Sequence, residues 1–347
     1  MSQGDLASAP TTDPALLLRY RDRQYAADMM AVAILKLNLF TWIDGQGSVT
    51  TAQLVSHFNF AARPLDVLLT LCRAGGWLVS EGETHRLTKM AEEHLVDSSL
   101  YFLGPYYQPI ADSPIAQGCM QVLTQNKAAN WQAKDDTSDW HESMMDDAFA
   151  QSFTALMNCR GVAMGQAMAA ALDPWMQDVE TLLDVGGGSG IYSSTLASRF
   201  TSLRGVVFEQ APVDAITRSE IERHGLQDRL SVQTGDMFKD AWPEADCILL
   251  SNVLHDWDFP DVRKLIEKCA LTLKVGGKVI VHEAFLNDAK DGPLPVAEYS
   301  VLLANITQGR CYSPAEYGKI FEEQGFECAP YVDTLADRGF FVATKKA

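Results

Sequence analysis

The pattern of apolar and polar positions divides the chain into two halves of different character. From Val179 onward, short apolar runs of strand length alternate with helical stretches, and another helix is expected after Ser313-Pro314. This alternation predicts an α/β doubly wound sheet of about seven strands. Only Asp333–Arg338 joins the last two strands, so we expect them to pair antiparallel. The expected strands are residues 179–185, 205–209, 229–234, 246–251, 277–283, 326–332 and 339–345.

Helical patterns dominate the first half. A helix is predicted to begin at Asp13-Pro14, where a capping residue precedes a proline at the first helical position. From Leu16 to Phe40, apolar residues cover most of the circumference of this helix. A helix that is apolar on several faces needs more than one partner surface. We therefore expect part of it to form a subunit contact in a homodimer, with burial inside its own domain as the alternative.

The next segment predicts two short helices and a hairpin. A capping box at Thr50–Gln53 opens a helix that continues through Phe58, and a second helix is expected over Pro64–Arg73. Strands at 77–80 and 84–87 then flank a turn. This order indicates a winged-helix domain, which in other proteins often binds DNA. The second helix carries Arg73 as its only basic residue, beside Asp66, so DNA binding is not favoured.

Residues 88–175 read as mostly helical, with a long helix from about Glu142 to Leu172. Aromatic side chains are unusually dense here, and they serve either as core or as a lid over an organic substrate. We expect a flexible N-terminus over 1–13, a winged-helix dimerisation domain over 14–100, a helical connector and lid over 101–175, and a catalytic domain over 176–347. The aromatic and histidine residues in question are Tyr101, Phe102, Tyr106, Tyr107, Trp131, Trp140 and His141.

Composition narrows the class of protein. The 347 residues suit two domains, and a net charge of −17 argues against a nucleic-acid partner, which requires a basic face. The seven cysteines are odd in number and form no CxxC pair, which predicts reduced thiols in a cytoplasmic protein without a metal site. The polar N-terminus and the lack of an apolar run near ~20 residues predict neither a signal peptide nor a membrane span.

A glycine-rich loop marks a candidate cofactor site. The strand ending in Asp184-Val185 runs into Gly186–Gly190, whose spacing is G-x-G-x-G, and a helix follows. The next strand ends in Glu209, whose carboxylate can accept both ribose hydroxyls of an adenosine. After the third strand, Asp236 can accept from an adenine amino group and Met237 can pack on the ring. We assign Asp184 to the same site.

A histidine follows the fourth strand, at the edge where ligands bind in open α/β sheets. Ser251 ends that strand, and His255-Asp256-Trp257 comes shortly after it. Imidazole suits the removal of a proton from a hydroxyl group near neutral pH. We therefore predict His255 as the general base, with Asp256 orienting the substrate.

These motifs resemble the class I methyltransferases that use S-adenosylmethionine (SAM). From about residue 14 to its end, the chain resembles the small-molecule O-methyltransferases typified by the caffeic acid and acetylserotonin enzymes. The resemblance implies a winged-helix dimerisation domain followed by a SAM domain. It also implies that Gly186, Gly188, Glu209, Asp236 and Met237 contact SAM. Ser251 stands where plant members often have a lysine near the cofactor.

The resemblance extends to the substrate side. Glu283 aligns with a family carboxylate that orients the catalytic histidine, whereas His282 alternates to the other side of its strand and is expected to pack. Cys311 replaces a second family glutamate, which weakens the carboxylate support of the histidine. Arg160 is able to pair with a carboxylate of substrate or cofactor, or to form a surface salt bridge. The predicted substrate-binding residues are Phe153, Met157, Arg160, Tyr106 and Asn305.

Three functions are consistent with these residues. The first is O-methylation of a small, hydroxylated or aromatic metabolite. The second is S-methylation of a thioether hydroxy acid of the 4-methylthio-2-hydroxybutyrate type, as in dimethylsulfoniopropionate synthesis, which releases no proton and needs no base. The third is a winged-helix regulator that senses SAM, which the acidic charge disfavours.

Overall fold

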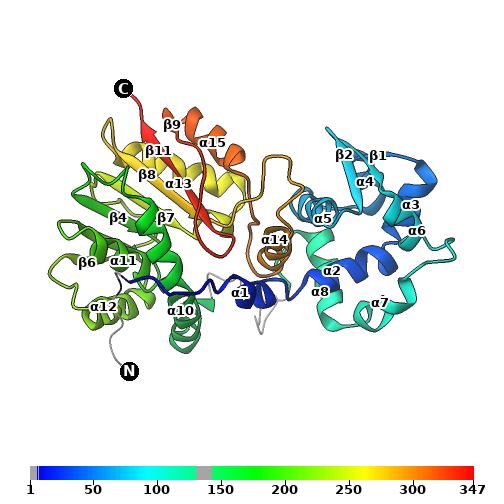
Figure 1. Cartoon of the computed structure of the whole chain (residues 1–347), viewed down its shortest axis with the longest axis horizontal. Coiled ribbons are helices and arrows are strands. Elements are labelled where there is room, and N and C mark those ends of the chain that lie inside the picture. Colours follow the sequence, from blue (N-terminus) through cyan, green and yellow to red (C-terminus); the bar gives the residue numbers. More distant parts are fainter. Residues whose placement is uncertain (1–5, 7, 130–142) are drawn as a thin grey trace. The chain divides into compact units, whose positions relative to one another are not determined.

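A computed structural model describes residue 6 and residues 8–129 and 143–347 (Figure 1). The chain forms two compact units. Unit 1 comprises Met1–Leu16, Ala133–Phe285 and Pro314–Ala347, and unit 2 comprises Leu17–Gln132 and Leu286–Ser313. Neither unit is contiguous in sequence, unlike the domains expected above. Of the aromatic cluster and the predicted start of the long helix, Trp131, Trp140, His141 and Glu142 lie outside the described residues.

Unit 1 is built on an eight-stranded sheet in the order β10-β11-β8-β7-β4-β5-β6, with β9 also paired to β11. Strands β4 to β8 pair in parallel, and β11 runs antiparallel to β8, β9 and β10, as predicted for the last two strands. The bounds are β4 Thr181–Val185, β5 Arg204–Glu209, β6 Leu230–Thr234, β7 Cys247–Ser251, β8 Lys278–Glu283, β9 Phe326–Cys328, β10 Val332–Asp333 and β11 Gly339–Lys345.

The strand expected at 326–332 is the main difference from the predicted sheet. It is split into β9 and β10, with Pro330 between them. Proline has no backbone N–H to donate to a strand ladder, so it interrupts pairing at this point. The α/β doubly wound fold is confirmed, with one strand more than expected.

The helices of unit 1 pack in two groups. Helices α10 (Asp147–Ala171), α11 (Ile191–Arg199) and α12 (Val213–Arg223) contact one another, and α13 (Phe259–Thr272) contacts α15 (Pro314–Glu323). The long helix expected from about residue 142 is described from Asp147, where the Asp146 side chain caps it by accepting from Phe149 N–H at 2.8 Å.

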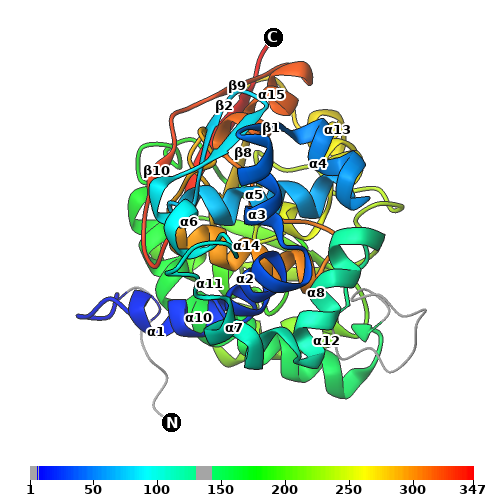
Figure 2. The ribbon, with the colours of Figure 1, turned by 90° about the vertical axis from the view of Figure 1, so that its right-hand side faces the viewer.

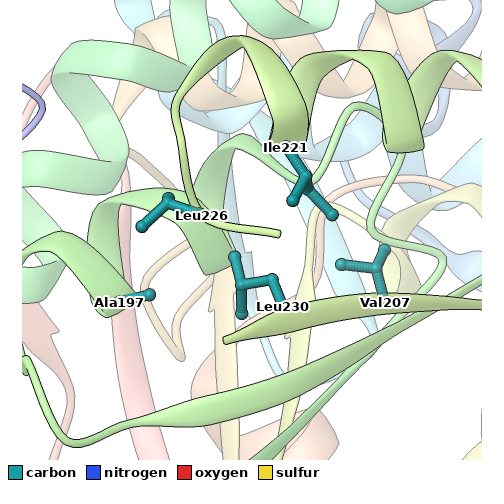
Figure 3. Packing of buried hydrophobic residues seen from close by; sticks show 5 residues of the cluster. All are labelled: Ala197, Val207, Ile221, Leu226 and Leu230. Carbon is teal, nitrogen blue, oxygen red and sulfur yellow. The ribbon is translucent and has the colours of Figure 1, made fainter. Parts of the chain in front are cut away.

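The core between α11, α12 and the sheet is apolar. Figure 3 shows Ala197, Val207, Ile221, Leu226 and Leu230 converging from α11, β5, α12, the loop after α12 and β6, and all five are at most 7% exposed. This packing holds the helix that follows the glycine loop against the strands.

Unit 2 holds the N-terminal helices and a three-stranded sheet in the order β1-β3-β2. Helices α4 and α5 and the β2–β3 hairpin form where helix, helix and wing were expected, and Thr50 and Gln53 form the expected capping box. The bounds are α2 Ala26–Ala31, α3 Leu39–Gln46, β1 Val49–Thr50, α4 Thr51–Phe58, α5 Ala62–Ala74, β2 Leu78–Glu81, β3 Thr84–Leu87, α6 Lys89–His94, α7 Gly104–Ala111, α8 Pro114–Gln125 and α14 Leu294–Ile306.

The single helix predicted from Leu16 to Phe40 is wrong. Helix α1 (Ala15–Asp22) ends before a turn, and a π-helical turn at Val32–Lys36 follows α2. Asn38 then adopts a left-handed conformation (φ 50°), which ends one helical path and starts α3. The apolar positions therefore face different surroundings: Met29 is buried, whereas Leu17 is 77% exposed.

Within the described residues, no single helix is both long and apolar enough to cross a membrane. The segments Ala26–Lys36 and Leu39–Gln46 reach that length and apolarity only together, across a bend of 54°.

Helix α14 explains why unit 2 is discontinuous. It is apolar and almost fully buried, and it packs against α5, α2 and α8, as Figures 1 and 2 show for α5 and α2. Polar bonds reinforce this packing, since Asp66 on α5 pairs with both Lys290 and Arg310. Arg63 also donates to the Gly309 carbonyl at 2.7 Å. Residues 286–313 thus belong to the N-terminal unit, although the sequence placed them in the catalytic domain.

Candidate active site

The glycine loop at the end of β4 leaves open space at its centre. Gly186, Gly188 and Gly190 all have positive φ, of 65°, 56° and 71°. A Cβ added at Gly188 would meet no atom within 4 Å, whereas one at Gly186 would lie 3.3 Å from Val253. Helix α11 begins at Ile191, directly after the loop. A ligand can therefore approach the backbone at Gly188 and reach the positive end of a helix.

Asp184 supports this loop from below. Its carboxyl group is 1% exposed and accepts from the Ser193 hydroxyl at 2.5 Å. A Cβ added at Gly187 would come within 2.6 Å of the Asp184 carboxyl carbon, so the two groups are in tight contact. Burial raises the pKa of Asp184 to about 6. This geometry favours support of the loop over direct contact with a ligand.

Glu209, at the end of β5, is tied to the glycine loop. One carboxylate oxygen accepts from Gly188 N–H at 2.9 Å, and the other accepts from Gln210 N–H at 2.8 Å. Desolvation raises the pKa of Glu209 to about 7, and the charges of Asp184 and Asp214 act in the same direction. A half-buried carboxylate in this position retains acceptor capacity for a diol beside the loop.

Asp236 and Met237 follow β6. Asp236 accepts from Phe238 N–H and from Lys239 Nζ, both at 2.8 Å, and these bonds outweigh burial and lower its pKa. The Met237 sulfur would lie 3.8 Å from a Cβ placed on Gly186, so the side chain borders the glycine loop. Its carbonyl accepts from Trp242 Nε1 at 3.1 Å.

These residues fit the adenosine part of SAM. Open backbone at Gly188, a carboxylate at Glu209 and a half-buried thioether at Met237 lie along the carboxyl ends of three adjacent strands. They offer, in that order, room for a ligand chain, an acceptor for ribose hydroxyls and an apolar surface for a base.

The second part of the site is the loop after β7. Glu283, at the end of β8, receives three backbone N–H groups on one oxygen: Val253 at 3.2 Å, Leu254 at 3.0 Å and His255 at 3.4 Å. Its other oxygen pairs with Nδ1 of His255. Both side chains are buried, at 1% and 3% exposure. A proton held between Nδ1 and Glu283 leaves Nε2 of His255 as the basic nitrogen.

Asp256 lies beside that nitrogen. Its Oδ1 is 3.7 Å from Nε2 of His255, which is close enough for attraction but too long for a hydrogen bond. Burial raises the pKa of Asp256 to about 6, opposed by His255 and Arg160 and assisted by the charge of Glu283. The loop thus brings together the three residues predicted as catalytic.

A network of buried hydrogen bonds lies at the end of β7, and the sequence analysis identified only some of its residues. Ser251 bonds to Nδ1 of His282 at 2.9 Å, and Asn252 donates to both Ser251 and Tyr192. His282 packs in the core, as expected from strand alternation. Asn252 directly follows a residue already singled out. Tyr192, by contrast, belongs to no recognisable motif.

Helix α10 contributes the predicted substrate-binding face. Phe153, Met157 and Arg160 share one side of the helix and are half-buried. Sequence reasoning missed Asn158, which accepts from the Ser189 hydroxyl at 2.9 Å and so ties α10 to the glycine loop.

Tyr106 and Asn305 belong to unit 2, together with Cys311. Tyr106 is 82% exposed on α7. Asn305 is buried on α14, donates to the Val301 carbonyl at 2.8 Å and accepts from the Cys119 thiol. Their assignment to the substrate site stays a prediction. No group of histidine, cysteine and acidic residues in the described parts of the chain is arranged to hold a metal ion.

Comparisons with known proteins agree with this geometry. Residues 119–327 match the model of the O-methyltransferase domain family. The 3-hydroxy-5-methyl-1-naphthoate 3-O-methyltransferase of Streptomyces sahachiroi is 27% identical over 282 residues, which is 80% of each chain. An O-methyltransferase family 2 protein from Planctomyces limnophilus, solved with apigenin, is 28% identical with a TM-score of 0.88, covering 99% of this chain and 100% of the other.

A third comparison bears on the fold. Human N-acetylserotonin methyltransferase, solved with SAM, has a TM-score of 0.61 at 21% identity, covering 98% of this chain and 100% of the other. This likeness shows the fold, and the family match covers more than half of the chain. The chain therefore belongs to the O-methyltransferase domain family, and it is a SAM-dependent methyltransferase of small molecules.

Proposed function

We propose that this enzyme methylates a hydroxyl group of a small aromatic metabolite, with His255 as the general base. The observation that carries the proposal is the pairing of Nδ1 of His255 with the buried carboxylate of Glu283. Glu283 holds the imidazole in one tautomer and stabilises the imidazolium that forms when Nε2 accepts the acceptor's proton. Bound SAM supplies a methyl group on a positively charged sulfur, which is electrophilic.

The residues around the glycine loop would hold that cofactor. We assign the ribose hydroxyls of the cofactor to Glu209 and its adenine to Asp236 and Met237. The chain of the cofactor would lie against the open backbone at Gly186 and Gly188. Asp184 and Ser251 would support this site without contacting the cofactor directly. The hydroxyl of Ser251 already forms hydrogen bonds with His282 and Asn252. Asp256, beside Nε2 of His255, orients the acceptor.

The proposed acceptor is a hydroxylated aromatic compound. The relatives point in this direction, since one is named for a hydroxynaphthoate and another was solved with apigenin. Phe153 and Met157 on α10 offer a flat and a flexible apolar side chain for packing an aromatic ring. Nothing in these relatives favours the thioether alternative, in which the buried His255–Glu283 pair would have no proton to accept.

We also propose a cytoplasmic homodimer that binds no nucleic acid. Its dimerisation domain would be a winged helix over residues 14–100. Exposed apolar side chains on α1, including Leu16, Leu17 and Tyr20, support a subunit contact. Light scattering at micromolar concentration should give twice the chain mass of 38.2 kDa. A monomer at all concentrations would refute this assembly.

The acceptor atom is tested by a turnover screen. Purified enzyme and SAM are incubated with phenols, hydroxy acids and thioethers, and the mass of each product and the position of the added methyl group are determined. We expect methyl ethers from phenols. Methylated thioethers without any methyl ether would overturn the proposal.

A further inference from the structure

The glycine loop after β4 is held by side chains of two helices as well as by Glu209. The Thr217 hydroxyl on α12 donates to the Gly188 carbonyl at 2.5 Å. The Ser189 hydroxyl donates to Oδ1 of Asn158 on α10 at 2.9 Å. Two consecutive residues of the loop are therefore anchored to α12 and α10, independently of the carboxylate that is proposed to bind the ribose.

The orientation of the Asn158 amide follows from its second partner. Its Nδ2 atom donates to the Glu220 carboxylate on α12 at 3.1 Å, and Arg223 pairs with the same carboxylate. An ionised carboxylate only accepts hydrogen bonds, so the amide nitrogen must face Glu220. The amide oxygen is then left to accept from Ser189, and Asn158 connects the glycine loop to α12 as well as to α10.

Helix α10 packs closely on the helix that follows the loop. A Cβ added at Gly161 would lie 2.5 Å from the Ile191 side chain, and one added at Gly165 would lie 2.5 Å from the Thr195 hydroxyl. Asn158, Gly161 and Gly165 are spaced three and four residues apart, so they lie on one face of α10. This close packing leaves α10 little room to move relative to α11, which makes Asn158 a fixed anchor for the loop.

The backbone of the glycine loop is able to adopt other conformations. Gly186, Gly188 and Gly190 all have positive φ, and glycine populates negative φ about as readily. A loop that leaves its binding conformation lowers the apparent affinity in proportion to the fraction that is lost. Ser189 is 2% exposed, so its hydroxyl serves to anchor the loop and does not face a ligand.

We propose that Asn158 is a positioning residue for methyl transfer, because its bond to Ser189 keeps the glycine loop in the conformation that binds the cofactor. Asn158 acts through the loop, so its loss weakens cofactor binding more than it slows methyl transfer from the bound cofactor. This inference rests on the proposed assignment of the glycine loop to the cofactor.

An exchange of amide and carboxylate tests this role in the full-length protein. Asn158→Asp keeps the size of the side chain but places a second carboxylate against Glu220. Glu220→Gln keeps an acceptor oxygen for the Asn158 amide. In the double variant Asn158→Asp/Glu220→Gln, the introduced carboxylate accepts from both the Ser189 hydroxyl and the introduced amide, so both hydrogen bonds are restored with the roles of the two positions exchanged.

Calorimetry with S-adenosylhomocysteine should show about tenfold weaker binding for Asn158→Ala and Asn158→Asp, because the loop then occupies its binding conformation about a tenth of the time. Glu220→Gln alone should stay within about twofold of the unmodified protein, and the double variant should recover to within about threefold. At saturating SAM, kcat should change by less than about threefold, whereas KM for SAM should rise.

Asp173→Asn is the matched control. Asp173, just after α10, pairs with Arg199, the last residue of α11, so this pair joins the same two helices at their ends away from the glycine loop. Its removal should leave the affinity for S-adenosylhomocysteine within about twofold. Chemical denaturation of every variant measures the free energy of unfolding, which separates a loss of affinity from a loss of stability.

Normal affinity in Asn158→Asp, or a double variant that binds no better than Asn158→Asp, would overturn the positioning role. The exchanged side chains keep their sizes, so this comparison gives a readout even if Asn158→Ala fails to fold. Glu209→Ala and Gly188→Ala in the same assay keep the two proposals apart. Normal binding by both would overturn the cofactor assignment and this inference with it, whereas weaker binding by both and normal binding by the Asn158 variants would remove only the role of Asn158.

Discussion

Two strands of the sheet end in a glutamate that accepts backbone N–H groups from a neighbouring loop, and we propose a different role for each of the two glutamates. Glu209 on β5 accepts from Gly188 and Gln210. Glu283 on β8 accepts from Val253, Leu254 and His255. In both places the carboxylate accepts backbone N–H groups that would otherwise lack a partner, at the carboxyl ends of the strands, where ligands bind in such sheets.

The surroundings of the two carboxylates make the difference. Glu209 is half-buried beside a glycine loop that leaves open space, so its oxygens stay available to a ligand. Glu283 is 1% exposed, and its remaining oxygen is committed to His255. Under the proposed function, a strand-end carboxylate is a ligand acceptor where the loop is open, and it orients a base where the loop closes over it.

The largest expected effect lies at the closed site. His255→Ala should lower kcat by about 10² or more, because the acceptor's proton then has no base. Affinity for S-adenosylhomocysteine should stay within about twofold, since Glu209 and the glycine loop are unchanged. Steady-state kinetics with the identified acceptor and calorimetry measure the two quantities.

His255→Gln is the matched control for this variant, because it keeps a polar side chain of similar size without basicity. It should be nearly as slow as His255→Ala. A His255→Gln enzyme of near-normal rate with a flat pH profile would contradict the proposal that Glu283 orients a base whereas Glu209 binds the cofactor.

The next effect lies at the open site. Glu209→Ala should weaken S-adenosylhomocysteine binding by about 5- to 150-fold, equivalent to about 1–3 kcal/mol, because buried donors and the ribose lose their acceptor. The rate of methyl transfer at saturating SAM should change much less. A variant with normal affinity but a large loss of kcat would show that Glu209 and Glu283 do not differ in role.

Binding at the open site should also depend on pH. The pKa of Glu209 is raised to about 7, so its carboxyl is mostly protonated below that pH and mostly ionised above it. A ribose diol donates best to the ionised form, so affinity should rise as pH rises through 7. The gain from pH 5.5 to 8 should be at most about 30-fold.

Glu209→Gln isolates this titration, since an amide keeps an acceptor oxygen but cannot ionise. Calorimetry from pH 5.5 to 8 should give a flat profile for this variant. A profile that still rises as in the unmodified enzyme would assign the titration to another group.

The smallest effect concerns the glycine loop itself. Gly188→Ala and Gly276→Ala each place a Cβ in open space at positive φ, of 56° and 82°. Both should therefore lower the free energy of unfolding by about 1 kcal/mol, which chemical denaturation can measure. Only Gly188→Ala should also weaken S-adenosylhomocysteine binding. Equal affinity in the two variants would remove Gly188 from the cofactor site.

Much of the sheet and of the open site could be predicted because their signals are local. Buried strands read as continuous apolar runs, and the glycine loop stands directly after one of them. The errors also have local causes that were overlooked. Pro330 splits a strand, and the left-handed Asn38 ends a helical path that apolar periodicity alone had continued.

The closed site depends on contacts between distant parts of the chain. Glu283 is 28 residues from His255, and they meet because β7 and β8 pair in parallel with Ser251 opposite His282. Resemblance to a family suggested this pair, whereas no pattern pointed to Tyr192. Side chains such as these acquire a role only from what the fold packs around them.

By itself, the sequence determined the alternation of strands and helices, the glycine loop with its following carboxylate, and the histidine after the fourth strand. These features depend on the types of residue and on short spacings between them, so a short segment of the chain is enough to specify each one. Only the tertiary structure decided that residues 286–313 join the N-terminal unit, through the pairing of Asp66 with Lys290 and Arg310. It also decided which strand-end glutamate is buried, since burial depends on packing from every side and not on the residue alone.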